Sequence, residues 1–354
     1  MMELKDMLIE AVKEKATDLH VTVDSPPVLR MHGHLIPMDH DKLDKDDTRR
    51  LLESILSPSQ LEVLREKQAV DLAYSLNGSQ HTGRFRVNIF HQRGALAGAF
   101  RRLSDAIVPL EDLNLPPSLY KLCDMNNGLV LVTGPTGSGK TTTLATLIDR
   151  INATRPCHII TIEDPIEYML EHKKALINQR ELHNDVPSFA EGLRSALRED
   201  PDVVFVGEMR DLETMRTAIM AAETGHLVFA TLHTRDATST IGRIVGVFPT
   251  DEQEQIAHQL SLTLRAVVSQ KLVRTKDGAG RVPAAEVMIV TSGIANMIRL
   301  HKTEQIRSVI ETGANQGMQS MEHSFVRLYK ECKIDRETVL GNARDVNYVE
   351  RLLR

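Results

Sequence analysis

The stretch "GPTGSGKT" fits the pattern G-x-x-x-x-G-K-[ST], with Gly134, Gly139, Lys140 and Thr141 at the fixed positions. It follows the apolar run "GLVLVT" and precedes a stretch with helical character. Glycines in such a loop allow consecutive backbone N–H groups to converge on an anion at the start of a helix. The pattern therefore predicts a phosphate-binding loop.

The side chains of this loop have predicted parts in binding ATP. Lys140 is expected to lie against the β and γ phosphates, and the Thr141 hydroxyl is expected to be a ligand of Mg²⁺. The predicted cofactors are therefore ATP and Mg²⁺. The alternative is a glycine-rich turn that binds nothing, and it leaves the placement of the lysine and the threonine unexplained. The predicted nucleotide-binding residues are Gly134, Pro135, Thr136, Gly137, Ser138, Gly139, Lys140, Thr141 and Thr142.

Length and composition restrict the class of protein. The chain has 354 residues, which favours two domains, and 42% of them are hydrophobic, which is enough for proper cores. The 43 basic and 48 acidic residues include no long basic block, so nucleic acid is a poor candidate partner. Three cysteines without a C-x-x-C pair exclude a disulfide framework and fit a reducing cytoplasm. Because no apolar run approaches the roughly 20 residues that cross a bilayer, membrane contact is expected only through partners.

The order of the predicted elements separates the two domains. In residues 1–104, short helical and strand patterns alternate, as in a small α+β domain. Residues 105–117 contain three prolines and are predicted to be a linker. In residues 118–354, unbroken apolar strands such as "LVLVTG", "HIITIE", "DVVFVGE" and "HLVFATLH" alternate with helices. This pattern predicts an α/β domain built on a parallel sheet.

Ionisable residues follow the predicted strands of this sheet, where open α/β sheets bind their ligands. Glu163 follows "HIITI", Glu208 follows "DVVFVG", and His233 follows "HLVFATL". Glu208 is expected either to hold Mg²⁺ through water or to orient the attacking water, and Glu163 to take the other role. His233 is expected to sense the γ phosphate through a hydrogen bond. The alternative is that such carboxylates cap the following helices and that the histidine is an ordinary core residue.

Arginines of the first domain are candidates for the positive charge that phosphoryl transfer needs from outside the phosphate loop. In "GRFRVNIF", the strand period of two puts Arg84 and Arg86 on one face and Phe85 and Val87 on the other. Arg101 ends the next strand, so the two strands are expected to form a basic patch that serves a neighbouring subunit. The alternative is that the three arginines are solvated surface residues.

Four linked motifs closely resemble the secretion ATPase superfamily. The stretches "GPTGSGKT", "TIEDPIEY", "LREDPDVVFVGEMRD" and "GHLVFATLHT" correspond, in this order, to its Walker A motif, Asp box, Walker B motif and His box. Two further stretches, "ATDLHVTVDSPPVLRMHG" and "GMQSMEHSFVRLYKECKI", look like the retraction ATPases of type IV pili, the PilT family. The resemblance spans essentially the whole chain. One departure is Leu300, which stands where that family commonly has a glutamate.

The resemblance implies a RecA-like P-loop NTPase domain preceded by a PAS-like domain, and a homo-hexameric ring that hydrolyses ATP at its subunit boundaries. It also implies a cytoplasmic motor at the cytoplasmic face of the inner membrane, which acts with a pilus platform protein in that membrane to retract pili during twitching motility. The alternatives are an accessory retraction motor, a pilus-assembly or type II secretion ATPase, a nucleic-acid translocase, and a regulator that binds nucleotide without useful hydrolysis.

Overall fold

The computed structural model describes residues 3–76, 83–103 and 106–354, and the chain forms two compact units. The first unit consists of Met1–Ala106 together with Pro165–Met169, and the second of Ile107–Asp164 and Leu170–Arg354. The predicted boundary between residues 104 and 105 lies outside the described residues. The second part of the predicted linker, from residue 107, is included in the second unit, where Leu110 and Leu115 are buried.

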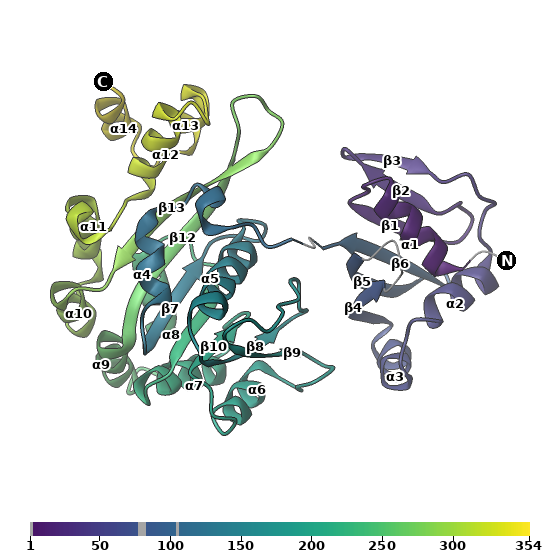
Figure 1. Cartoon of the computed structure of the whole chain (residues 1–354), viewed down its shortest axis with the longest axis horizontal. Coiled ribbons are helices and arrows are strands. Elements are labelled where there is room, and N and C mark those ends of the chain that lie inside the picture. Colours follow the sequence, from purple (N-terminus) through teal and green to yellow (C-terminus); the bar gives the residue numbers. More distant parts are fainter. Residues whose placement is uncertain (1–2, 77–82, 104–105) are drawn as a thin grey trace. The chain divides into compact units, whose positions relative to one another are not determined.

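The first unit is an antiparallel sheet with the strand order β3-β2-β1-β6-β5-β4, packed against three helices (Figure 1). Strand β5 shows the predicted period of two, because Phe85 and Val87 are buried in the core of the unit while Arg86 is exposed. The elements are α1 (Leu4–Lys13), β1 (Asp18–Val21), β2 (Val28–Met31), β3 (His34–Pro37), α2 (Lys45–Glu53), α3 (Pro58–Lys67), β4 (Ala69–Leu76), β5 (Gly83–Gln92) and β6 (Ala95–Arg102).

The second unit is built on a sheet with the strand order β13-β12-β7-β11-β10-β8-β9. All neighbouring strands are parallel except the hairpin of β12 and β13. Its strands are β7 (Gly128–Thr133), β8 (His158–Glu163), β9 (Leu176–Glu181), β10 (Val203–Val206), β11 (Leu227–Leu232), β12 (Leu264–Arg274) and β13 (Arg281–Ile289).

Helices cover both faces of this sheet. The α-helices of the second unit are α4 (Tyr120–Cys123), α5 (Lys140–Thr154), α6 (Phe189–Ala196), α7 (Leu212–Glu223), α8 (Ala237–Val247), α9 (Gln253–Thr263), α10 (Ser292–Arg299), α11 (Ile306–Thr312), α12 (Met321–Lys330), α13 (Arg336–Asn342) and α14 (Val346–Leu353). Short 3₁₀ helices lie at Leu110–Leu113, Pro117–Leu119, Thr303–Gln305 and Ala314–Gln316. None of the described helices is long and apolar enough to cross a membrane.

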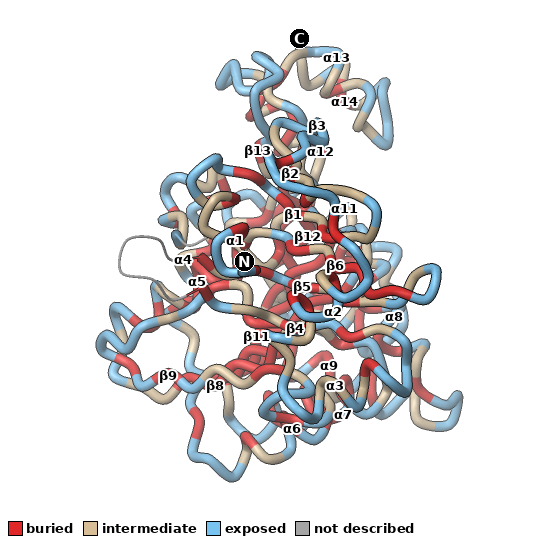
Figure 2. The backbone as a smooth tube through the Cα atoms, turned by 90° about the vertical axis from the view of Figure 1, so that its right-hand side faces the viewer, coloured by how far each residue is buried: buried red, intermediate tan, exposed pale blue. Residues whose placement is uncertain are grey.

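Successive residues of the parallel strands enter two separate cores, so these strands are buried on both faces (Figure 2). In β7, Leu129 and Leu131 pack with helices α6 to α10, whereas Val130 and Val132 pack with α5. This packing is the reason that the strands are unbroken apolar runs in the sequence.

The register of the sheet brings the ends of its strands together. Thr133 of β7 is opposite Leu232 of β11, so the phosphate loop and His233 leave the sheet side by side. Val206 of β10 is opposite Ile162 of β8, so the residues that follow these two strands are also neighbours. The fold therefore gathers the predicted strand-end residues of the second unit at one edge of the sheet.

Candidate active site

The phosphate loop has a backbone shape that only glycine adopts easily. Gly134, Gly137 and Gly139 have φ angles of +144°, +74° and +88°, in the left-handed region that disfavours residues with a Cβ atom. A Cβ atom at Gly134 would also lie 2.2 Å from the backbone oxygen of Gln270 in β12. The loop therefore passes too close to the neighbouring strand for any side chain at residue 134.

Two polar side chains of the loop are arranged for an anion. Lys140 is only 9% exposed, and its Nζ donates hydrogen bonds to the carbonyl oxygens of Gly134 at 2.8 Å and Pro135 at 3.1 Å. The Ser138 hydroxyl is buried, and among the described residues it has no hydrogen-bond partner. Buried polar groups are normally paired, so this hydroxyl fits a loop whose remaining partner is a phosphate.

The remaining predicted loop residues lie around this centre. Pro135, Thr136 and Gly137 are exposed at the rim, and Thr141 and Thr142 are half-buried in the first turn of α5. The loop is fastened from both ends to β12. The Thr133 hydroxyl donates to Ser269 Oγ at 2.9 Å, and the Thr143 hydroxyl donates to Gln270 Oε1 at 2.8 Å. The loop is thus held in place from outside the motif.

Gly134→Ala is expected to weaken ATP binding by at least about tenfold, because the added methyl group must displace either the loop or β12. Gly137→Ala is the matched control. Its φ angle is also positive, but a Cβ atom there meets nothing within 4 Å, so only a backbone cost of about 1 kcal/mol is expected. Titration of both full-length variants with a fluorescent ATP analogue measures the difference. Equal affinities would contradict the proposed close approach at residue 134.

Glu208 lies at the centre of a charged cluster at the strand ends. Its Oε1 accepts a hydrogen bond from Arg210 Nε at 2.7 Å and lies 2.8 Å from His233 Nε2. Burial alone would raise the pKa of Glu208, but the Arg210 hydrogen bond and the charges of His233, Arg210 and Lys140 outweigh it and lower the pKa below its usual value. Glu208 is therefore ionised at neutral pH and lies within electrostatic reach of the phosphate-loop lysine.

Glu163 is nearby but differently engaged. Gly207, which separates Glu208 from β10, donates its N–H to Ile162 O at 2.7 Å, so the ends of β8 and β10 are in direct contact. Glu163 is 5% exposed, and its Oε1 accepts hydrogen bonds from Thr161 Oγ1 at 2.6 Å and Gln179 Nε2 at 3.1 Å. One oxygen of Glu163 is thus committed to its own and the adjacent strand.

The alternative roles, capping a helix or lying in the core, apply to some strand-end residues and not to others. Asp211 is a helix cap, since its side chain accepts a hydrogen bond from the Thr214 N–H at the start of α7. His233 is not a core residue, because its side chain is 43% exposed and contacts Glu208. Arg210 was not among the predicted residues. Its signal in the sequence is its position two residues after Glu208, which puts both side chains on one side of an extended chain.

The three candidate arginines belong to the first unit and lie on the paired strands β5 and β6. Arg86 and Arg101 are directly opposite each other across these strands. Arg84 donates to Ile166 O at 2.6 Å and to Ser75 Oγ at 2.8 Å, and Arg101 Nε donates to Asp18 Oδ1 at 3.0 Å. Arg86 is exposed, and among the described residues its side chain makes no hydrogen bond or ion pair. Of the three, Arg86 has the guanidinium most available to a ligand.

Comparison with known proteins gives the family of the chain. A model of the family described as type II/IV secretion system proteins matches residues 2–338. The chain belongs to this family. It is 44% identical over 343 residues to the type IV pilus retraction ATPase PilT of Pseudomonas aeruginosa, with 97% of this chain and 98% of that protein covered. It is 45% identical over 319 residues to a twitching motility protein of Neisseria gonorrhoeae, with 90% and 84% covered.

Members of the family also share its architecture. The crystal structure of the pilus retraction motor PilT with bound ADP has a TM-score of 0.91 and 45% sequence identity to this chain. The match covers 99% of this chain and 100% of the PilT chain. The predicted relationship to retraction ATPases, the ATPase activity and the fold class, a RecA-like α/β domain preceded by a PAS-like domain, are thereby confirmed. The roles predicted for individual residues stay predictions.

Proposed function

We propose that this chain is a motor that couples ATP hydrolysis to the retraction of a type IV pilus. The observation that carries the proposal is the juxtaposition of the phosphate loop with Glu208, Arg210 and His233 at the ends of adjacent strands. The loop supplies backbone donors and a lysine for the phosphates, and the cluster supplies an ionised carboxylate for the attacking water. The similarity to proteins named for pilus retraction and twitching motility supports the mechanical output.

The residues present suit a magnesium ion that is held chiefly by ATP. Within the described part of the chain, no group of three or more His, Cys, Asp or Glu side chains is arranged to hold a metal. Mg²⁺ commonly takes one or two protein ligands, and the phosphates and water supply the others. Thr141 would hold the ion, and the bound ion would neutralise phosphate charge. Because Glu208 is assigned to the attacking water, the second predicted role, holding the ion through water, would fall to Glu163.

We also propose a homo-hexamer that acts at the cytoplasmic face of the inner membrane, on a pilus platform protein there. This proposal rests on the relationship to retraction ATPases and on the exposed arginines Arg86 and Arg101, which suit an active site shared between subunits. Deletion of the gene and complementation in a piliated host tests the function. Excess surface pili without twitching would support retraction, whereas cells without pili would refute it in favour of assembly.

Mixing two inactive variants is expected to restore ATPase activity in part, if an arginine acts across the subunit boundary. Lys140→Ala removes the phosphate-loop lysine, and Arg86→Ala removes the positive charge proposed to reach the neighbouring active site. A mixed ring therefore places some intact loops beside intact arginines. The measurement is steady-state phosphate release from the mixture and from each variant alone. A mixture of Lys140→Ala with Lys140→Met is the control, since no subunit there has an intact loop. Complete failure of rescue in verified mixed rings would show that Arg86 acts within its own chain.

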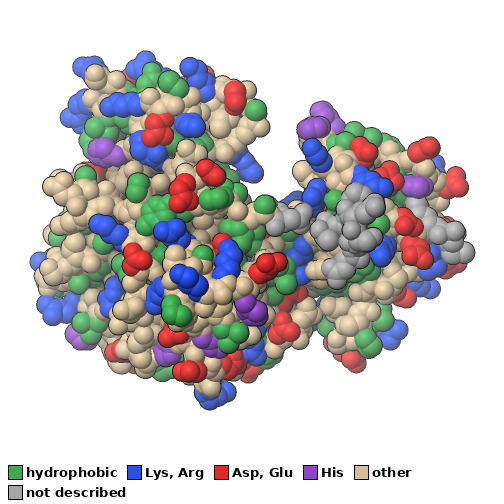
Figure 3. Space-filling model, viewed as in Figure 1, with side chains coloured by type: hydrophobic (Ala, Val, Ile, Leu, Met, Phe, Trp, Pro, Cys, Tyr) green, Lys and Arg blue, Asp and Glu red, His purple; other side chains and the backbone are tan. Residues whose placement is uncertain are grey.

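A nucleic-acid translocase is a less favoured alternative than another pilus or secretion ATPase, although it has the same core. Such a protein needs a surface dominated by basic side chains, and often aromatic side chains that stack on bases. On the face of the second unit shown in Figure 3, Lys and Arg side chains are interspersed with Asp and Glu side chains. The whole chain has an aromatic content of 4%. Stimulation of ATP hydrolysis by DNA, with a steep dependence on salt, would reverse this ranking.

A further inference from the structure

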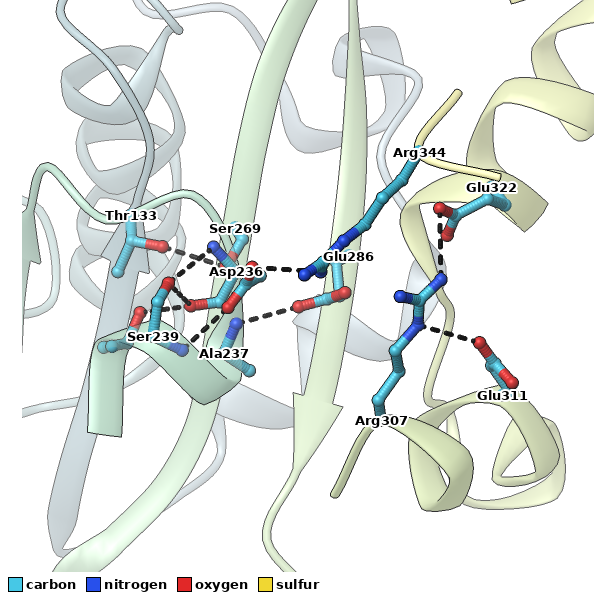
Figure 4. A network of polar contacts seen from close by, with 11 residues as sticks. Thr133, Asp236, Ala237, Ser239, Ser269, Glu286, Arg307, Glu311, Glu322 and Arg344 are labelled. Carbon is cyan, nitrogen blue, oxygen red and sulfur yellow. Dashed lines mark hydrogen bonds and ion pairs between the residues drawn. The ribbon is translucent and has the colours of Figure 1, made fainter. Parts of the chain in front are cut away.

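The segment that follows His233 is anchored at the point where it becomes a helix. Helix α8 begins at Ala237, and the Asp236 carboxylate caps it by accepting a hydrogen bond from the Ser239 N–H at 2.7 Å. The Ala237 N–H itself donates to Glu286 Oε1 at 2.8 Å (Figure 4). Glu286 belongs to β13, the edge strand of the sheet, so this bond ties the segment after β11 to the far side of the phosphate loop.

Glu286 occupies an unusual place for a carboxyl group. It is 9% exposed and lines a cavity of about 730 Å³ that reaches from Pro135 and His233 to the C-terminal helices. Burial raises the pKa of Glu286 to about 7, with Asp236 and Glu322 also raising it and the Ala237 hydrogen bond and Arg307 lowering it. Burying an acid in this way costs free energy, which an apolar residue at position 286 would avoid.

The other polar side chains around Glu286 are paired with one another, so its carboxyl group bonds only to the start of α8. Arg307 Nε donates to Glu311 Oε1 at 3.1 Å, and Arg307 Nη2 lies 3.6 Å from Glu322 Oε1 (Figure 4). Among the described residues, the only hydrogen bond of the Glu286 side chain is the one that it accepts from the Ala237 N–H. The carboxyl group therefore has one structural task, to satisfy and hold the first N–H group of α8.

We infer that Glu286 is a positioning residue for ATP hydrolysis: it fixes the start of α8 and, through residues 233–236, the place of His233 beside Glu208. The inference rests on the proposed function, because it takes His233 to act during hydrolysis. Glu286 is assigned no contact with the nucleotide. The phosphate loop is fastened separately, through Thr143 and Gln270, so the loss of Glu286 should impair turnover more than ATP binding.

Kinetics of full-length variants test this inference. Glu286→Ala removes the acceptor and is expected to lower kcat about tenfold, the effect of one lost hydrogen bond, with ATP affinity changed less than about twofold. Glu286→Gln keeps an acceptor oxygen and should retain kcat within about twofold. Glu322→Ala is the matched control, because Glu322 is 5% exposed in the same cavity but bonds to no residue of the 233–237 segment. If Glu286→Ala does not fold, Glu286→Leu fills the space without an acceptor and replaces it.

Amide hydrogen exchange separates positioning from general damage. In Glu286→Ala, the segment 233–240 should exchange at least about tenfold faster than in the wild type, and in Glu286→Gln and Glu322→Ala it should not. In a His233→Ala background, Glu286→Ala should lower kcat little further, since both changes act on one group. Three results would each overturn the inference. They are a double variant whose loss of kcat is the product of the two single losses, an unchanged amide exchange rate of residues 233–240 in Glu286→Ala, and a loss of kcat in Glu286→Gln as large as in Glu286→Ala. If His233→Ala alone leaves kcat at the wild-type value, the proposed role of His233 fails, and the exchange rates still decide whether Glu286 holds α8.

Discussion

Lys140→Ala is expected to reduce ATP turnover to less than about a thousandth of the wild-type rate. The Lys140 ammonium is almost fully buried in the phosphate loop, where a charge opposing the β and γ phosphates acts in a low dielectric and no other lysine of the motif can replace it. Single-turnover release of phosphate from ATP at saturating protein measures the chemical step directly.

The Lys140 substitution needs a control for the shape of the loop. The ammonium also bonds to the carbonyl oxygens of Gly134 and Pro135, so its removal frees part of the loop as well as removing a charge. Lys140→Met keeps the length of the side chain and should be as inactive as the alanine variant. Substantial hydrolysis by either variant, with an unchanged melting temperature, would refute the phosphate-loop assignment.

Glu208→Gln should retain ATP binding while kcat falls about a hundredfold or more. The amide oxygen of glutamine can still accept hydrogen bonds from Arg210 and His233, so the shape of the cluster survives while its negative charge is lost. Because the surrounding positive charges lower the pKa of Glu208, the wild-type carboxylate stays ionised through the whole neutral range. Equilibrium binding of ATP and single-turnover hydrolysis, measured on the same preparation, separate the two effects.

Glu163→Gln is the matched control for Glu208, because it makes the same chemical change on the adjacent strand end. One oxygen of Glu163 already serves Thr161 and Gln179, so we expect a smaller loss of kcat than at Glu208. If Glu163→Gln is the more damaging of the two, the roles of the carboxylates must be exchanged.

Sequence alone could predict the parts of the site that depend on local pattern. The phosphate loop is recognisable because its glycines and Lys140 have fixed spacing, and Glu163, Glu208 and His233 are recognisable because each follows an unbroken apolar strand. Parallel strands end at one edge of a sheet, so local patterns suffice to bring these residues together.

Contacts between residues far apart along the chain could not be predicted in this way. Glu286 and Ala237 are 49 positions apart and meet only because α8 packs against the hairpin of β12 and β13. Strand β9 gives no such signal in the sequence, since only Leu176 and Ile177 are apolar and its other four residues are polar. The close contact of Gln270 with the phosphate loop depends on the pairing of β12 with β7. No sequence motif predicts this pairing.

The attachment of the phosphate loop to β12 has a consequence for folding during translation. Thr133 and its partner Ser269 are separated by 136 positions, which take about 7 to 27 s to translate at typical rates of about 5–20 residues per second. Throughout that interval, the motif has been translated but lacks the strand against which it rests. We therefore expect the phosphate loop to reach its final shape only after β12 has emerged, and β7 to lack one of its two neighbouring strands until then.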